Sequence, residues 1–467
     1  MDNQQVLEAG GQQKKLFLRP GSLTFNDPYP AVKNGIWVYF FLLIFEGGLR
    51  KWVLPGLAAP LLIVRDPVAI WLIVIAWRRG LLKSNFSLSA TFAISIFGLV
   101  TALIYGHGNL LVGIYGVRTL LLHFVLIFII GNVFNRDDVL KIGKAMIWIT
   151  IPMTILLILQ FYSPQSAWVN LGIGADTAGG GFSGALGYFR PPGTFSFING
   201  TVLFYSLSAC FILYFWFSPK RYIKRPLLIA ASVAVAIAIP MSISRSLFFM
   251  VAFTGIFVLI GFARNARRTG TMITAALVIL TIFLVLSQLT FFQTATEAFS
   301  TRLTNASEIE GGFSGTFGNR YLGSLLNAFN VSGDFPFFGY GIGMGTNVGS
   351  QLLTGEVNFL IAEGEWGRLV GELGLVLGLA IILTRVGLTV KIAILAFKKL
   401  SVGDFLPWIL TSYCFLTVPQ GQWAQPTTLG FSVFVAGLTI AAFSVQKQEK
   451  KQERNDLIAG RMTRLFT

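Results

Sequence analysis

Long apolar runs recur from one end of this sequence to the other. Most of them have about 18 or more residues, enough for an α-helix to cross the hydrocarbon core of a bilayer. A transmembrane β-barrel shows short alternating segments instead. Twelve runs are found: 36–54, 59–77, 87–105, 110–131, 142–162, 195–217, 226–242, 245–262, 271–290, 366–390, 403–418 and 427–445. The sequence therefore predicts an all-α polytopic membrane protein with about 12 transmembrane helices.

The composition agrees with a membrane protein. Of the 467 residues, 54% are hydrophobic and only 12% are charged, whereas soluble proteins carry about 25% charged residues. The two cysteines lie inside apolar runs, which gives no sign of a disulfide framework. The first 34 residues are polar and lack the pattern of a cleaved signal peptide.

The positive charges predict the orientation. All but nine of the 36 Lys and Arg residues fall in segments on one side, among them WRRGLLK, SPKRYIKRP, the stretch from Arg385 to Lys399 and the tail KQEKKQER. The positive-inside rule makes that side the cytoplasm and places both termini in it. We expect a cytoplasmic tail over 1–35, a transmembrane domain over 36–445 and a basic cytoplasmic tail over 446–467. The net charge of +16 is then explained by topology, and no nucleic-acid partner is expected.

The remaining nine basic residues lie in spans or on the outer side. They are Arg50, Lys51, Arg65, Arg118, Arg190, Arg245, Arg302, Arg320 and Arg368. Eight of the nine are arginine, whose planar donors suit phosphate and carboxylate groups. One interpretation is an anion site on the outer face. The alternative is that each Arg pairs with an outward acid to hold helices together, and adjacent Arg65 and Asp66 are expected to neutralise each other.

Two outer connections are long, at about 163–194 and 291–365, and loops of that length are usually functional. The second contains a predicted amphipathic helix at RYLGSLLNAF and then the glycine run GYGIGMG. No strand precedes this run, so it does not match a nucleotide-binding loop. The chain has only two histidines, and its first outer loop lacks a paired acidic motif, so no metal or other cofactor is expected.

Three patches on the outer side carry a resemblance to a known family. They are FRPPGTFSFINGTVLFYSL (189–207), SISRSLFFMVAFTG (242–255) and NRYLGSLLNAFNVSGDFPFFGYGIG. The order of these elements resembles that of the O-antigen ligase and polysaccharide polymerase superfamily of bacterial inner-membrane proteins. The likeness covers roughly residues 180–380, whereas the first 150 residues match only in span layout.

The resemblance implies a multi-pass enzyme of the bacterial inner membrane with its active site facing the periplasm. Such an enzyme transfers a glycan from undecaprenyl diphosphate to an acceptor sugar hydroxyl, without metal and with inversion of the anomeric centre. Its partners are the lipid-linked glycan donor, a glycan or lipid-linked acceptor and membrane lipids, and polysaccharide-assembly proteins are compatible with it. The expected diphosphate contacts are Arg190, Arg245, Arg320 and Arg368, and the expected base is Glu363, with Glu365 as the alternate.

The sequence departs from the family pattern at one point. The family's ligases carry a His eleven positions before a helix Gly, and counting back from Gly374 reaches Glu363. This carboxylate favours a polymerase or sibling transferase over a lipopolysaccharide ligase. The rival interpretation from another class is a secondary transporter or a flippase of lipid-linked oligosaccharides. Transporters gather polar groups near the bilayer midplane, whereas here they gather at the outer span ends.

The stretch IAEGEWGRLVGELGLVLG (361–378) combines two helical patterns. Glu365, Arg368 and Glu372 recur at i, i+3 and i+7, which predicts mutual ion pairing on one helix face. Five glycines from Gly364 to Gly378 form a second stripe that suits close helix packing in lipid. Glu363 lies before the helix and outside the charged pattern.

Overall fold

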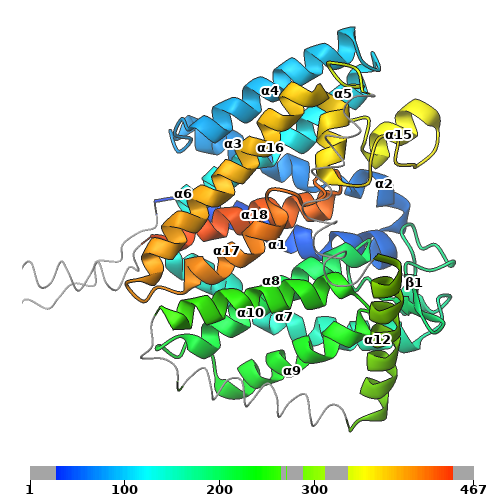
Figure 1. The fold of residues 1–467 in the computed structure, drawn as a ribbon, viewed down its shortest axis with the longest axis vertical. Helices are drawn as coiled ribbons and strands as arrows, with labels where there is room; N and C mark the ends of the chain where they lie inside the picture. The colour runs from blue at the N-terminus through cyan, green and yellow to red at the C-terminus, as the bar shows by residue number, and fades with distance from the viewer. Residues whose placement is uncertain (1–27, 265–269, 271–287, 311–334, 445–467) are drawn as a thin grey trace, which may run out of the picture.

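The protein is a bundle of helices (Figure 1). The computed structural model describes residues 28–264, 270, 288–310 and 335–444. The α-helices are α1 (Pro30–Gly48), α2 (Ala58–Leu61), α3 (Arg65–Arg78), α4 (Phe86–Ile104), α5 (Leu110–Val117), α6 (Phe124–Val133), α7 (Arg136–Tyr162), α8 (Ile198–Phe217), α9 (Arg225–Met241), α10 (Arg245–Ala263), α12 (Thr290–Glu310), α15 (Asn347–Thr354), α16 (Glu365–Leu400), α17 (Leu406–Thr417) and α18 (Pro426–Ala442).

The predicted helical membrane architecture is confirmed. Within the described part of the chain, eight helical segments are long and apolar enough to cross a membrane, and three shorter apolar helices, α9, α17 and α18, accompany them. Most of the predicted span at 271–290 lies outside the described residues. The count of twelve spans and the cytoplasmic position of both termini stay predictions. The predicted tail 1–35 is described only from residue 28, and α1 already begins at Pro30. The predicted tail 446–467 lies outside the described residues.

The core of the bundle lies around α8 and α18. Nearly all of α8 is enclosed, since 17 of its 20 residues are buried. Helix α18 packs against α6, α17 and α8. In Figure 1, α7 to α10 lie below α17 and α18, and α3, α4 and α16 lie above them. A helix surrounded by other helices can be apolar on every face, which explains why α8 shows no polar side in its sequence.

Two predicted spans are interrupted by π-helical turns. Leu49–Val53 extends α1 at its end, and Arg118–Leu122 joins α5 to α6. The first turn contains Arg50 and Lys51 and the second contains Arg118, three of the nine basic residues predicted in spans or on the outer side. Single π-helical turns are uncommon and often occur at functional positions, because they re-aim side chains. Here Arg50 contacts Glu46 one turn earlier on α1, and Arg118 contacts Asp66 of α3.

Helix α16 is bent sharply at Gly374, which has φ 74° and ψ 172°. The bend frees the carbonyls of Gly371 and Glu372, and these accept hydrogen bonds from the backbone of Tyr340 (2.8 Å) and Gly341 (3.0 Å). The glycine run GYGIGMG therefore packs onto the break in α16. The predicted stripe of five glycines along one continuous helix is wrong, because Gly374 ends the first helical segment.

The two long connections that were predicted on the outer side contain regular structure. Residues 163–194 form a small antiparallel pair of strands, β1 (Phe182–Ala185) and β2 (Tyr188–Arg190), an exception to the all-α prediction. Helices α12 and α15 belong to the second connection, and α12 stands across the ends of α9 and α10 beside β1 (Figure 1). The predicted helix at RYLGSLLNAF lies outside the described residues.

Candidate functional site

Three of the arginines on the predicted outer side are paired with carboxylates, and two of these pairs join different helices. Arg50 and Arg65 both contact Glu46 of α1, at 3.5 and 3.1 Å. Arg118 donates to both oxygens of Asp66, with Nη2 at 2.9 Å from Oδ1. The expected neutralisation of Arg65 by Asp66 is therefore wrong, because each of the two residues pairs with a different helix. For these arginines the structural interpretation holds, and they are not available as an open anion site.

Arg190, Arg245 and Arg302 come together at one corner of the molecule; we call them the arginine cluster. Arg190 Nε and Arg302 Nη1 both donate to the carbonyl oxygen of Ser183, each at 3.2 Å. Arg302 Nη1 also reaches the carbonyl of Gly184 at 3.2 Å. The third member is the first residue of α10, and its charge acts on Arg190. All three side chains are partly exposed, so a ligand can approach them.

Local structure fixes these arginines. Phe182 pairs with Arg190 across the β1–β2 hairpin, and the guanidinium lies over the Phe182 ring at 5.9 Å. The hairpin packs against α12, which carries Arg302. The hydroxyl of Ser244 caps α10 by accepting from the backbone N–H of Leu247 at 3.4 Å, which sets where Arg245 begins the helix.

The electrostatics of the cluster favour an anion. Partial burial lowers the pKa of Arg190, and repulsion by Arg302 and Arg245 lowers it further, to about 10. The charges of Arg302 and Arg245 thus disfavour the cationic form of Arg190, a cost that a bound polyanion would offset. The bidentate donors of arginine match phosphate oxygens. The cluster is suited to hold a phosphate or diphosphate group.

Glu365, Arg368, Glu372 and Arg385 form a second group, the buried ladder. Arg368 contacts Glu365 and Glu372, each at 2.7 Å, as the spacing predicted. Arg385 adds a further contact to Glu365 at 2.8 Å. All four side chains are 3% exposed or less. With two carboxylates and two guanidinium groups, the ladder is neutral and closed to solvent.

Arg385 was expected in a cytoplasmic connection, and that expectation is wrong. It lies within α16, which continues to Leu400, and its guanidinium stacks on the Trp423 ring at 3.7 Å. A straight helix would place residues twenty positions apart about 30 Å from each other. The bend at Gly374 is what brings Arg385 back to Glu365.

Two of the expected site residues, Glu365 and Arg368, therefore belong to the buried ladder. Both oxygens of Glu365 accept hydrogen bonds from arginine, and Oε2 also accepts from the backbone N–H of Trp423 at 3.0 Å. Neither Glu365 nor Arg368 has contact with solvent that would let it meet a substrate. Their geometry assigns both to the ladder that stabilises the start of α16.

Glu363, unlike Glu365 and Arg368, lies outside the buried ladder. Its side chain is exposed, two residues before α16 begins. Its backbone carbonyl accepts from Gln422 Nε2 at 3.0 Å, and Gln422 accepts in turn from Gln425 Nε2 at 2.8 Å. Gln425 also accepts from Asn199 Nδ2 at 2.8 Å. This chain of amides connects Glu363 to the start of α8, which follows the segment carrying Arg190.

The remaining expected residue, Arg320, lies outside the described residues. Arg302 was among the outward arginines but was not selected, because its own sequence surroundings resemble no motif. Within the part of the chain that is described, no group of three or more His, Cys, Asp or Glu side chains is arranged to hold a metal ion.

Comparison of the sequence with protein-family models, with curated proteins and with solved structures found no match. The assignment of a function to this chain accordingly depends on the residues and geometry described above.

Proposed function

We propose that this protein is a glycosyltransferase of the O-antigen polymerase or ligase type. It moves a glycan from undecaprenyl diphosphate to an acceptor sugar hydroxyl, at the periplasmic face of a bacterial inner membrane. The observation that carries the proposal is the arginine cluster. Three arginines gathered at one place, beside a bundle of long apolar helices, match the charge of a lipid-linked diphosphate.

The cluster would act on the leaving group. When the bond between the anomeric carbon and the diphosphate oxygen breaks, the bonding electrons pass to that oxygen and negative charge develops there. Preorganised donors at such a position stabilise a transition state by several kcal/mol. We assign this role to Arg190, Arg245 and Arg302, and Arg320 remains a proposed contact from the sequence.

Glu363 is the proposed base. The acceptor hydroxyl attacks the anomeric carbon from the face opposite the departing diphosphate, and this displacement inverts the anomeric centre. The proton of the hydroxyl passes to the Glu363 carboxylate. Glu363 is exposed and free of the buried ladder, and the amides of Gln422, Gln425 and Asn199 offer hydrogen bonds near it that suit sugar hydroxyls. Glu365 and Arg368 are assigned to structural support, not to the reaction.

The proposal includes no metal, because the arginines supply the positive charge that a divalent cation would otherwise provide. Purified protein is incubated with an undecaprenyl-diphosphate-linked oligosaccharide and an acceptor, with and without a chelator. Extended glycan and free undecaprenyl diphosphate are expected in both conditions. A donor left intact across several oligosaccharides would contradict a transferase, and transbilayer movement of the intact donor would favour the flippase alternative.

A further inference from the structure

A pocket lies at the end of the bundle opposite the arginine cluster. Its volume is about 280 Å³, near the lower limit for small-molecule sites. It is formed where α7 begins and where α8 and α16 end, and by the connection from α16 to α17. The positive-inside rule predicts that this end faces the cytoplasm.

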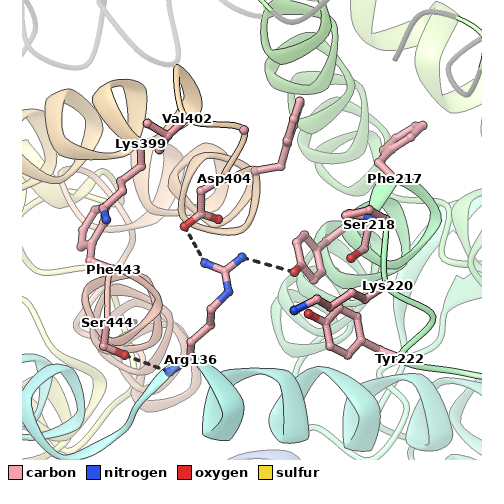
Figure 2. Close-up of a pocket in the computed structure, with 14 residues that line it drawn as sticks. Arg136, Phe217, Ser218, Lys220, Tyr222, Lys399, Val402, Asp404, Phe443 and Ser444 are labelled. Atoms are coloured by element: carbon pink, nitrogen blue, oxygen red, sulfur yellow. Dashed lines mark hydrogen bonds and ion pairs between the residues drawn. The ribbon is translucent and has the colours of Figure 1, made fainter. Parts of the chain in front are cut away.

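The walls of the pocket are basic and aromatic (Figure 2). Arg136, Lys220 and Lys399 line it, and Asp404 is the single acidic residue among the lining side chains. Arg136 Nη1 pairs with Asp404 at 2.5 Å, and its Nη2 donates to the hydroxyl of Tyr214 at 3.4 Å. Three cations against one anion leave the lining with an excess of two positive charges.

The Arg136–Asp404 pair and a second contact of Arg136 hold the segments that form one side of the pocket. The backbone N–H of Arg136 donates to Ser444 Oγ at 2.9 Å, which ties the start of α7 to the end of α18. Figure 2 shows Lys399 and Lys220 on opposite walls, with Tyr222 beside Lys220, and Tyr214 also lines the pocket. Tyrosines of this kind, apolar in the ring and polar at the tip, are enriched where a membrane meets water.

We infer that this pocket binds a phosphate group, supplied by the headgroup of an anionic lipid in the adjacent leaflet. A cavity of this size admits a headgroup, while the acyl chains remain in the bilayer. Basic pockets between transmembrane helices on the cytoplasmic side are suited to anionic headgroups. Lys220 and Lys399 contact the phosphate oxygens, and the tyrosine hydroxyls donate to the remaining acceptors. This inference is independent of the proposed transferase activity.

The test uses the full-length protein in detergent and measures retained lipid by native mass spectrometry. Wild type is compared with Lys220→Gln/Lys399→Gln and with a control, Lys224→Gln/Lys398→Gln, which removes equal charge from exposed positions outside the pocket lining. Wild type and control are expected to retain phosphatidylglycerol in preference to phosphatidylcholine. The pocket variant should bind it at least about tenfold more weakly, as expected for lost charge-assisted hydrogen bonds.

A second experiment distinguishes a lipid headgroup from a soluble phosphate compound as the ligand. Glycerol phosphate is added as a soluble competitor. If it displaces the lipid only at far higher concentration, the site takes a lipid headgroup; displacement at matching concentration would overturn the lipid as the source. Equal retention by all three proteins, or no preference for the anionic lipid, would overturn the inference altogether.

Discussion

Arg190 and Arg302 donate to the same carbonyl oxygen, that of Ser183, each at 3.2 Å. Each guanidinium group carries five N–H donors, so two that share one acceptor are close enough to donate to a single ligand. Arg190 comes from a β-hairpin and Arg302 from α12, so the two long connections hold these cations near each other. The proposed donor site depends on this relationship.

Replacement of Arg190 should not destabilise the empty protein. Burial and the neighbouring arginines lower its pKa to about 10 in the folded state, from about 12.5 in the unfolded chain. Folding therefore disfavours the cation. The cost is present at all pH values below about 10 and falls as pH rises toward the unfolded pKa. Arg190→Gln is expected to unfold at the same or a higher temperature than wild type at pH 8.

That difference should shrink as the pH approaches about 11, because wild-type Arg190 then loses its proton. The measurement is thermal unfolding of both proteins in detergent over this pH range, so that other titrating groups cancel in the comparison. A clear loss of stability in Arg190→Gln at pH 8 would show that the arginine is a structural contact and not part of a repulsive cluster.

Glu363→Gln should lower turnover without changing the fold. Removing a general base typically lowers a rate by about 10²–10⁴-fold, and Glu363 is exposed before the start of α16. The matched control is Glu356→Gln, an exposed carboxylate of the same connection that accepts from Asn358 at 2.9 Å. The control should keep wild-type transfer rates. Full activity in Glu363→Gln would remove this residue from the mechanism.

Breaking the buried ladder should destabilise the protein strongly. Glu365→Gln leaves Arg385 buried without its carboxylate, and breaking a buried ion pair costs about 3–5 kcal/mol. The double variant Glu365→Gln/Arg385→Met removes that uncompensated charge and should be more stable than the single variant. Unfolding in detergent measures both. If the losses in the free energy of unfolding from the two single substitutions simply add in the double variant, Glu365 and Arg385 are not energetically coupled.

The bend in α16 gives a prediction about glycine. Gly374→Ala would place a methyl group against the carbonyl of Phe337, at a φ of 74° that alanine rarely adopts, and should cost at least about 2 kcal/mol. Gly387→Ala lies in the same helix with nothing near the added carbon and should stabilise by up to about 1 kcal/mol. Equal unfolding temperatures for the two variants would contradict a required bend.

Local patterns in the sequence predicted the parts of the structure that depend on local spacing. The contacts of Arg368 with Glu365 and Glu372 follow from positions one helical turn apart. The link from Glu365 to Arg385 does not, because it needs the bend at Gly374. Several glycines of that stretch tolerate a positive φ, and only the packing of residues 337–341 selects one of them.

In the candidate site too, contacts between residues distant in the sequence were not predicted. Arg190 and Arg245 were predicted from short motifs, each beside the start of a span. Arg302 was not selected, because what makes it part of the cluster is the carbonyl of Ser183, far away in sequence. Arg65 was misjudged for a similar reason, since its partner Glu46 lies on a different helix and its neighbour Asp66 points to Arg118.

The most direct test of the central claim compares glycan transfer by wild type and by Arg190→Gln/Arg302→Gln. The substrate is an undecaprenyl-diphosphate-linked oligosaccharide, and the readout is kcat/KM for release of undecaprenyl diphosphate. The control is Arg264→Gln, at the opposite end of α10, where Arg264 lies over the Phe397 ring at 4.3 Å. We predict transfer by wild type and control, and a loss of about 100-fold or more in the double variant. No transfer by wild type, or equal transfer by all three, would contradict the account.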